Sequence, residues 1–211
     1  MNKRYIFLAA FFIVIGFGAI FFSEKLPLEE VSPNTLFREL NDPSRFLGTD
    51  MLAQKIIEGD PAIQLVDTRS PEQYKAYSLP GAMNIPLEEL IDSTGNIQSK
   101  WLDYLEMEGM KTVFFSNGDV CADQAWVLCT RMNVKNLYVL KGGLNRWVET
   151  ILRPVPPDIF APETAFEQYN FRKGASLYFG GGNQEMQSTT PIKKVVTVQR
   201  RKKKTAVSGG C

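Results

Sequence analysis

The sequence contains no histidine in 211 residues and only 3 cysteines. Without histidine the chain cannot form a Ser-His-Asp or Cys-His catalytic pair, nor a metal site with imidazole ligands. The three cysteines, at 121, 129 and 211, do not have the spacing of a zinc site or of a disulfide framework. We therefore expect neither a metal nor a cofactor.

Charge is missing from residues 5–22, which are almost entirely apolar. As a helix this run would be about 27 Å long, close to the thickness of a bilayer's hydrocarbon core. It predicts an N-terminal transmembrane anchor. The alternatives are a cleaved signal sequence, whose apolar core is usually about 7–15 residues, and a buried helix of a soluble protein. Lys3 and Arg4 before the run, with Glu24 after it, favour a single-pass membrane protein whose soluble domain lies outside the cytoplasm, on the periplasmic side.

Acidic residues are absent from residues 191–211, so the net charge of +1 conceals an uneven distribution. This segment can bind anionic lipid headgroups, nucleic acid or an acidic protein, or it can be a soluble tail without a partner. Beside a membrane anchor, the membrane surface is the nearest partner, and we expect no nucleic acid. The basic residues of the segment are Lys193, Lys194, Arg200, Arg201, Lys202, Lys203 and Lys204.

The composition divides the chain into five segments. The anchor (1–22) is followed by a proline-containing linker (23–43) and then by a domain that alternates helical and strand patterns (44–153). Prolines open an extension (154–182) whose aromatic residues predict that part of it packs on the domain. A run of glycines then leads into the basic tail (183–211).

Within the domain, helical and strand patterns alternate. Buried strands are expected at 62–69, 112–115 and 136–143, with a shorter one near 83–86. Helices are expected at 35–40, 49–60, 71–77, 87–91, 100–107, 123–132 and 144–151. Thr49 or Asp50 is a candidate N-cap. This order predicts an α/β fold with a mainly parallel sheet and helices on both faces.

Ligands of such sheets bind beyond the carboxyl ends of the strands. Asp67 and Arg69 follow one predicted strand, and the loop at 115–121 follows another. We therefore expect them at one edge of the sheet. The stretch VFFSNGDVCADQAW (113–126) has the order strand, tight loop and helix start that can bind an anion or present a nucleophile.

Several motifs in order resemble a rhodanese-like domain over about residues 48–150. They are Asp67 and Arg69 at a strand end, then Pro71, Glu72 and Tyr74, the segment Leu79 to Pro86, and finally Gly142, Gly143 and Trp147. The resemblance implies a parallel α/β fold. It also implies sulfur transfer through a cysteine persulfide that sits in a loop before a helix N-terminus, where backbone N–H groups lower the thiol pKa.

The chain departs from the family pattern Cys-x-x-Gly-x-Arg-Ser/Thr at the decisive positions. Aligned on Gly118, the nucleophile position holds Phe115, and a shift of one residue places Ser116 there. A serine without a base is not ionised near neutral pH, and its oxygen cannot carry sulfane sulfur as a thiolate does. Val120 stands where a basic residue often lies, and Ser78 replaces a histidine of the family.

The candidate anion-binding loop therefore comprises Ser116, Asn117, Gly118, Asp119, Val120 and Cys121. Cys121, in the first turn of the helix, is the candidate catalytic residue. It is interpreted as a displaced nucleophile, as a redox-sensitive thiol, or as a small residue in the place of Ser or Thr. Cys129 is expected in the core beside Trp126. Asp67 and Arg69 lie at the site edge or form a structural ion pair that holds the strand end.

Three functions are compatible with these observations. The first is an anchored rhodanese-like domain without ordinary sulfurtransferase activity, which binds a sulfur-containing anion or a protein partner. The second is an active sulfurtransferase that uses Cys121 or Cys211, and a related phosphatase is a weaker third. Cys211 can reach the loop, form an intermolecular disulfide or have no role. Whether the protein is an enzyme stays open at this point.

Overall fold

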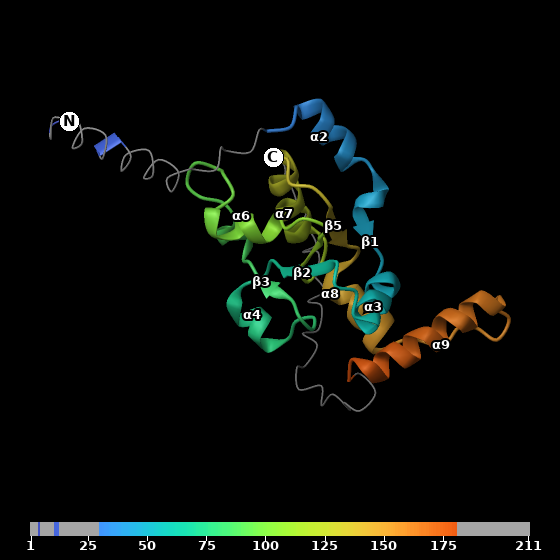
Figure 1. Cartoon of the computed structure of the whole chain (residues 1–211). Helices are drawn as coiled ribbons and strands as arrows, with labels where there is room; N and C mark the ends of the chain where they lie inside the picture. The colour runs from blue at the N-terminus through green and yellow to red at the C-terminus, as the bar shows by residue number, and fades with distance from the viewer. Residues whose placement is uncertain (1–3, 5–10, 13–29, 181–211) are drawn as a thin grey trace, which may run out of the picture.

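The structure is a computed structural model that describes residues 4, 11, 12 and 30–180. Its centre is a five-stranded sheet in the order β1-β5-β4-β2-β3, in which every neighbouring pair is parallel (Figure 1). The strands are β1 (Phe46–Leu47), β2 (Ile63–Asp67), β3 (Met83–Asn84), β4 (Lys111–Phe115) and β5 (Leu137–Leu140). The predicted α/β fold with a parallel sheet is confirmed.

The described helices account for nearly all the helical patterns of the sequence. They are α2 (Pro33–Leu40), η1 (Pro43–Arg45), α3 (Thr49–Glu58), α4 (Pro71–Ala76), α5 (Leu87–Leu90), α6 (Ser99–Leu105), α7 (Val120–Arg131), α8 (Gly143–Trp147), the π-helical turn η2 (Val148–Leu152) and α9 (Glu163–Tyr178). In Figure 1, α6 and α7 lie on one side of the strands, and α3, α8 and α9 lie on the other.

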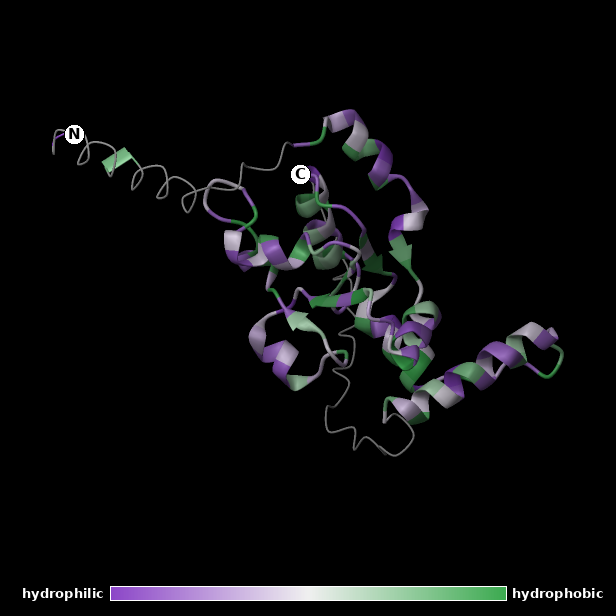
Figure 2. Ribbon diagram, in the orientation of Figure 1, coloured by the Kyte–Doolittle hydropathy of each residue, from purple (hydrophilic) through white to green (hydrophobic). Residues whose placement is uncertain are grey.

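Two apolar cores result, one on each face of the sheet. Phe114 of β4 belongs to the core under α5, α6 and α7, whereas Val113 and Phe115 belong to the core under α3, α8 and α9. All three side chains are fully buried. A central parallel strand covered on both faces is apolar at successive positions, which explains the continuous run of hydrophobic residues in its sequence. Figure 2 shows the same contrast between the mostly apolar strands and the polar outer faces of the helices.

Three features differ from the expectations. The N-cap of α3 is Gly48, because Thr49 and Asp50 are already inside the helix, so the N-cap prediction was wrong. Strand β1 was not predicted, and neither was α9 in the extension. Helix α9 packs on the domain through Ala175, which is buried in the core of α3 and α8.

The predicted anchor cannot be compared with the structure. In the described part of the chain, no helix has the length and hydrophobicity to span a bilayer. The run at 5–22 lies almost wholly outside the described residues, as does the basic tail beyond Gly180.

Candidate functional site

The carboxyl ends of β2 and β4 lie next to each other, as the sequence predicts. Asp67, the last residue of β2, is in register with Phe115, the last residue of β4. The backbone N–H and the hydroxyl of Thr68 both donate to the Phe115 carbonyl, over 3.0 and 3.1 Å. The loop at 116–119 leaves β4 at this point and leads into α7.

Neither residue at the aligned nucleophile position is available for chemistry. Phe115 is part of β4, and its side chain is fully buried in the core under α3, α8 and α9. Ser116 is 4% exposed, and its hydroxyl donates to the carbonyl of Gly118 over 2.6 Å. The ring and the hydroxyl therefore serve the fold of the loop.

Helix α8 holds the loop through its backbone. The N–H groups of Leu144 and Asn145 donate to the carbonyls of Ser116 and Asn117, each over 2.9 Å. Gly143 permits this contact, because a Cβ atom there would lie 2.5 Å from the Ser116 carbonyl oxygen.

Asp119 has a structural partner on the same side. Its carboxylate accepts a hydrogen bond from the backbone N–H of Gly142 over 2.5 Å. Gly142 has a left-handed backbone with φ of 77°, which orients this N–H toward the loop. The negative charge of the loop thus stabilises the turn between β5 and α8.

Several backbone N–H groups of the loop have no acceptor in the described part of the protein. Within residues 30–180, no protein acceptor receives a hydrogen bond from the backbone N–H groups of residues 117–122. The last of these groups belong to the first turn of α7, where the helix dipole adds partial positive charge. The loop can therefore bind a group that offers oxygen or sulfur acceptors.

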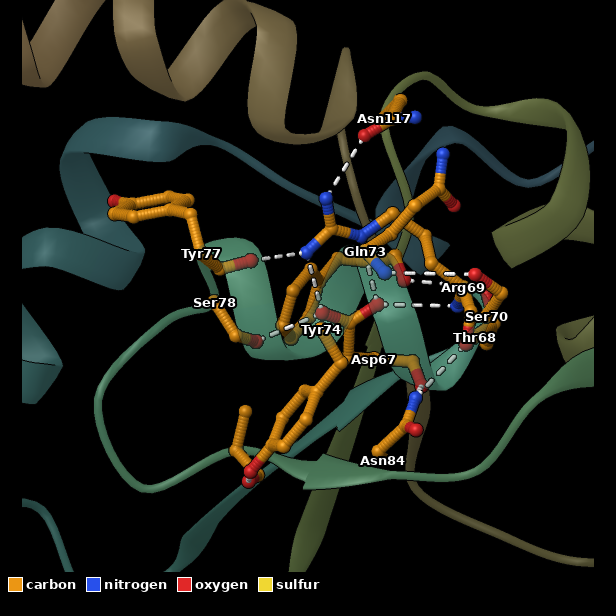
Figure 3. Close-up of polar contacts among 12 residues, drawn as sticks. Asp67, Thr68, Arg69, Ser70, Gln73, Tyr74, Tyr77, Ser78, Asn84 and Asn117 are labelled. Carbon is orange, nitrogen blue, oxygen red and sulfur yellow. Dashed lines mark hydrogen bonds and ion pairs between the residues drawn. The ribbon is translucent and has the colours of Figure 1, made fainter.

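A buried ion pair fixes the end of β2 (Figure 3). The Arg69 guanidinium donates to both carboxylate oxygens of Asp67, over 2.9 and 2.7 Å. Asp67 is fully buried and also accepts from the Ser78 hydroxyl over 2.7 Å. Arg69 donates further to the Asn117 side chain and to the Tyr77 carbonyl, over 3.0 and 2.5 Å. These contacts use the hydrogen-bond donors of the Arg69 guanidinium, which links β2 to the loop. They support the interpretation of Asp67 and Arg69 as a structural ion pair.

A pocket of about 560 Å³ lies between this network and the loop. Its apolar wall includes Leu87 and Val120, and Val120 is 69% exposed. Cys121 also lines the pocket, and its thiol is free and exposed. By contrast, Cys129 is fully buried and burial raises the pKa of its thiol to about 12, so its prediction as a core residue is confirmed.

The charges around the pocket are not those of a site for small anions. Arg69 is the cation that lines it, and Asp67 neutralises this charge. Glu88 and Glu89 form an acidic rim; Lys100 pairs with Glu89 over 3.0 Å, whereas Glu88 has no ion pair in the described part of the chain. The pocket therefore lies against the loop that carries these N–H groups, and two carboxylates are among its lining residues.

Sequence reasoning missed two parts of this site. The wall formed by the start of α5, from Pro86 to Glu89, was identified only as a helix after a turn. Ser78 was noted as a departure from the family, but its role as a donor to Asp67 depends on the folded chain. The signal that could have found the wall is its position after β3, since β3 pairs with β2 and ends at the same edge.

Comparison with known proteins identifies a family and several proteins to which this chain is similar. Residues 49–150 match the rhodanese-like domain family. The chain is similar to "Adenylyltransferase and sulfurtransferase UBA4" of Meyerozyma guilliermondii, with 29% identity over 96 residues that cover 44% of this chain and 22% of that protein. Among solved structures, a rhodanese-related protein of Thermoplasma volcanium is 22% identical with a TM-score of 0.40, covering 49% of this chain and 90% of that one. The rhodanese-like domain of an Anabaena protein is 23% identical with a TM-score of 0.41, covering 56% and 89%.

Proposed function

Because residues 49–150 form a rhodanese-like domain, we propose that this domain is a binding module without ordinary sulfurtransferase activity, held outside the cytoplasm by a membrane anchor at 5–22. The proposal rests on the two residues at the aligned nucleophile position, neither of which presents a reactive group to the pocket. Phe115 is fully buried, and the Ser116 hydroxyl is bonded to Gly118. The pocket beside them stays open at about 560 Å³. The site thus retains a space for a ligand but has no reactive group at the aligned nucleophile position.

The surroundings of the pocket favour a peptide of a protein partner over a small sulfur-containing anion. Thiosulfate could accept hydrogen bonds from the N–H groups at 117–122, but it would face Glu88 and Glu89 without a free cation in the pocket wall. A peptide offers carbonyl acceptors to the N–H groups and basic side chains to the carboxylates. Its apolar side chains can contact Leu87 and Val120.

A second candidate, sulfur transfer by Cys121, rests on the exposed thiol in the pocket wall. The name of the similar Meyerozyma protein includes sulfurtransferase, although this chain covers only 22% of that protein. In this reaction the Cys121 thiolate would attack the outer sulfur of thiosulfate and release sulfite. Cyanide would then take the sulfur from the persulfide as thiocyanate. Cys211, which lies outside the described residues, is the other thiol that could act in this way.

A thiosulfate:cyanide assay on the full chain tests the two candidates together. The matched variants are Cys121→Ser and Cys211→Ser, each of which removes one thiol and changes little else. We expect no thiocyanate above the uncatalysed rate, and no persulfide on either cysteine by mass spectrometry. Activity that one substitution abolishes would instead establish the enzyme and refute the binding module.

The anchor is tested separately by membrane fractionation. The full chain should remain with membranes after an alkaline carbonate wash, and a chain that begins at residue 23 should not. Protease added to intact spheroplasts should digest the domain if it lies outside the cytoplasm. A domain protected until the cells are lysed would contradict this orientation.

A further inference from the structure

We propose that the basic segment at residues 193–204 of this chain docks into the pocket between Arg69, Glu88 and Cys121. This inference rests on the proposed binding role of the pocket and names its occupant. Three observations lead to it: the charge of the pocket rim, the place where the chain leaves the domain, and the composition of the segment itself.

The rim of the pocket is complementary to a cationic segment. Glu88 and Glu89 are exposed at the start of α5, and both line the pocket. The Arg69 side chain is 9% exposed and its charge is neutralised by Asp67, so it presents little repulsion to an incoming cation. Exposed carboxylates beside a concave surface attract basic side chains and are screened by salt.

The chain leaves the domain within reach of this pocket. Phe179, at the end of α9, packs edge-on against Trp147, with the ring centroids 5.0 Å apart. Trp147 lies one turn along α8 from Gly143, which contacts the loop at 116–118. The rise of about 6 Å from Gly143 to Trp147, the two side chains and the 5.0 Å between their rings together put the end of α9 within roughly 25 Å of the loop. The residues from 181 to 193 span up to about 43 Å when extended, so the basic segment can reach the pocket.

The composition of the segment suits the pocket beyond its charge. The sequence KKVVTVQRRKKK, residues 193–204, contains basic residues and valines and no acidic residue. The valines can contact the apolar wall of Leu87 and Val120, and the basic side chains can reach Glu88 and Glu89. The backbone carbonyls of the segment can accept from the unpaired N–H groups at 117–122. Because the segment is part of the same chain, its effective concentration is high and each contact can be weak.

The position of two cysteines gives a direct test in the full chain. Cys121 lines the pocket, and Cys211 follows Lys204 by a stretch of about 23 Å at most when extended. Docking would therefore keep the Cys211 thiol within reach of Cys121. Diamide accepts the two electrons and two protons that the thiols lose on forming a disulfide, and is reduced to the hydrazine. The protein is kept in neutral detergent, and the Cys121–Cys211 peptide is measured over time by mass spectrometry.

Two sets of variants separate docking from random collision. The first replaces Arg200, Arg201 and the three lysines at 202–204 by glutamine, which changes no residue of the folded domain. The second is Glu88→Lys with Glu89→Lys. Its matched control is Glu106→Lys with Glu108→Lys, because both of these carboxylates are exposed and precede β4 at the opposite edge of the sheet.

We expect an intramolecular disulfide whose rate does not depend on protein concentration. The rate should fall about tenfold in each test variant and in high salt, and stay unchanged in the control, because several exposed charge pairs are lost together. Equal rates in all variants would overturn the proposal. So would a product that is mainly a dimer linked through Cys211, or charge effects that appear only when vesicles with anionic lipid compete for the segment.

The failure of this inference can be distinguished from the failure of the proposed function. One outcome is that the rate of disulfide formation is the same in the charge variants and that thiosulfate leaves no persulfide on Cys121. In that case the docking of residues 193–204 is refuted, and the proposal of a binding module is retained. If thiosulfate does modify Cys121, the proposal of a binding module is wrong. The effect of the charge variants on the rate of disulfide formation then still shows whether residues 193–204 dock into the pocket.

Discussion

Replacement of Gly143 by alanine should displace the loop at 116–118 and destabilise the domain. Gly143 has a left-handed backbone with φ of 55°. A Cβ atom built on it would lie 2.5 Å from the Ser116 carbonyl oxygen and 2.7 Å from that of Gly118. Both neighbours are backbone atoms, so neither can rotate away as the end of a side chain would. Either the loop or the start of α8 must move.

The expected loss in the free energy of unfolding has two contributions. A left-handed backbone costs alanine about 1–2 kcal/mol compared with a right-handed one. Movement of the loop weakens the hydrogen bonds from Leu144 and Asn145, both now 2.9 Å long, and each such bond contributes about 0.5–1.5 kcal/mol. The free energy of unfolding should therefore fall by roughly 2–4 kcal/mol.

Urea unfolding of the full chain in neutral detergent, followed by tryptophan fluorescence, measures this difference. Gly59→Ala is the matched control, because Gly59 has a φ of 66° and a Cβ atom there would have no neighbour within 4 Å. Gly59→Ala should lose only the backbone contribution, about 1–2 kcal/mol. A loss in Gly143→Ala that does not exceed the loss in Gly59→Ala would refute the steric argument.

Three further predictions concern buried and paired groups. Arg69→Met should destabilise the domain by about 3–5 kcal/mol because it leaves the carboxylate of Asp67 buried without a cation, and the added change Asp67→Asn should recover part of that loss in urea unfolding. Burial alone would raise the pKa of Asp50, but the hydrogen bonds from Arg172 and Gln168 and the charges of Arg172 and Arg146 together outweigh it and lower the pKa below 3.8. This stabilisation is present above the unfolded-state pKa and is lost as the pH falls through the folded-state pKa, so Asp50→Asn should cost about 1 kcal/mol at pH 7 and almost nothing near pH 2. Cys129, whose pKa burial raises to about 12, should resist a thiol reagent at pH near 8 until the protein is unfolded, and native labelling at that position would contradict its burial.

The sequence predicted the sheet and the edge that carries the candidate site because those features depend on local patterns. The apolar runs at 113–115 and 137–140 are continuous, as in strands covered on both faces. Ser70 and Pro71 mark the start of α4, where the Ser70 side chain accepts a hydrogen bond from the Gln73 N–H. Once parallel strands are recognised, Asp67 and the loop after β4 must lie at one edge.

The remaining features depend on partners that are remote in the sequence. The Thr49 hydroxyl bonds to that of Thr150, and the Asp50 carboxylate bonds to Arg172 of α9, so neither residue caps α3. Strand β1 has only two residues, too few for any periodicity, and it exists through its pairing with β5. Helix α9 contains Gly174 in its interior, which weakens the helical pattern, and its packing on α3 and η2 stabilises it instead.

The hydrogen bonds from α8 to the loop also affect which substitutions the loop can accept during evolution. Leu144 and Asn145 donate to the backbone carbonyls of Ser116 and Asn117, so these two hydrogen bonds do not require a particular side chain at either loop position. A substitution on the loop can remove a reactive group and leave the concave shape intact. The same independence makes the loop a suitable place to install new side chains by design. Gly143 is the exception on which the arrangement depends, since it must remain without a side chain.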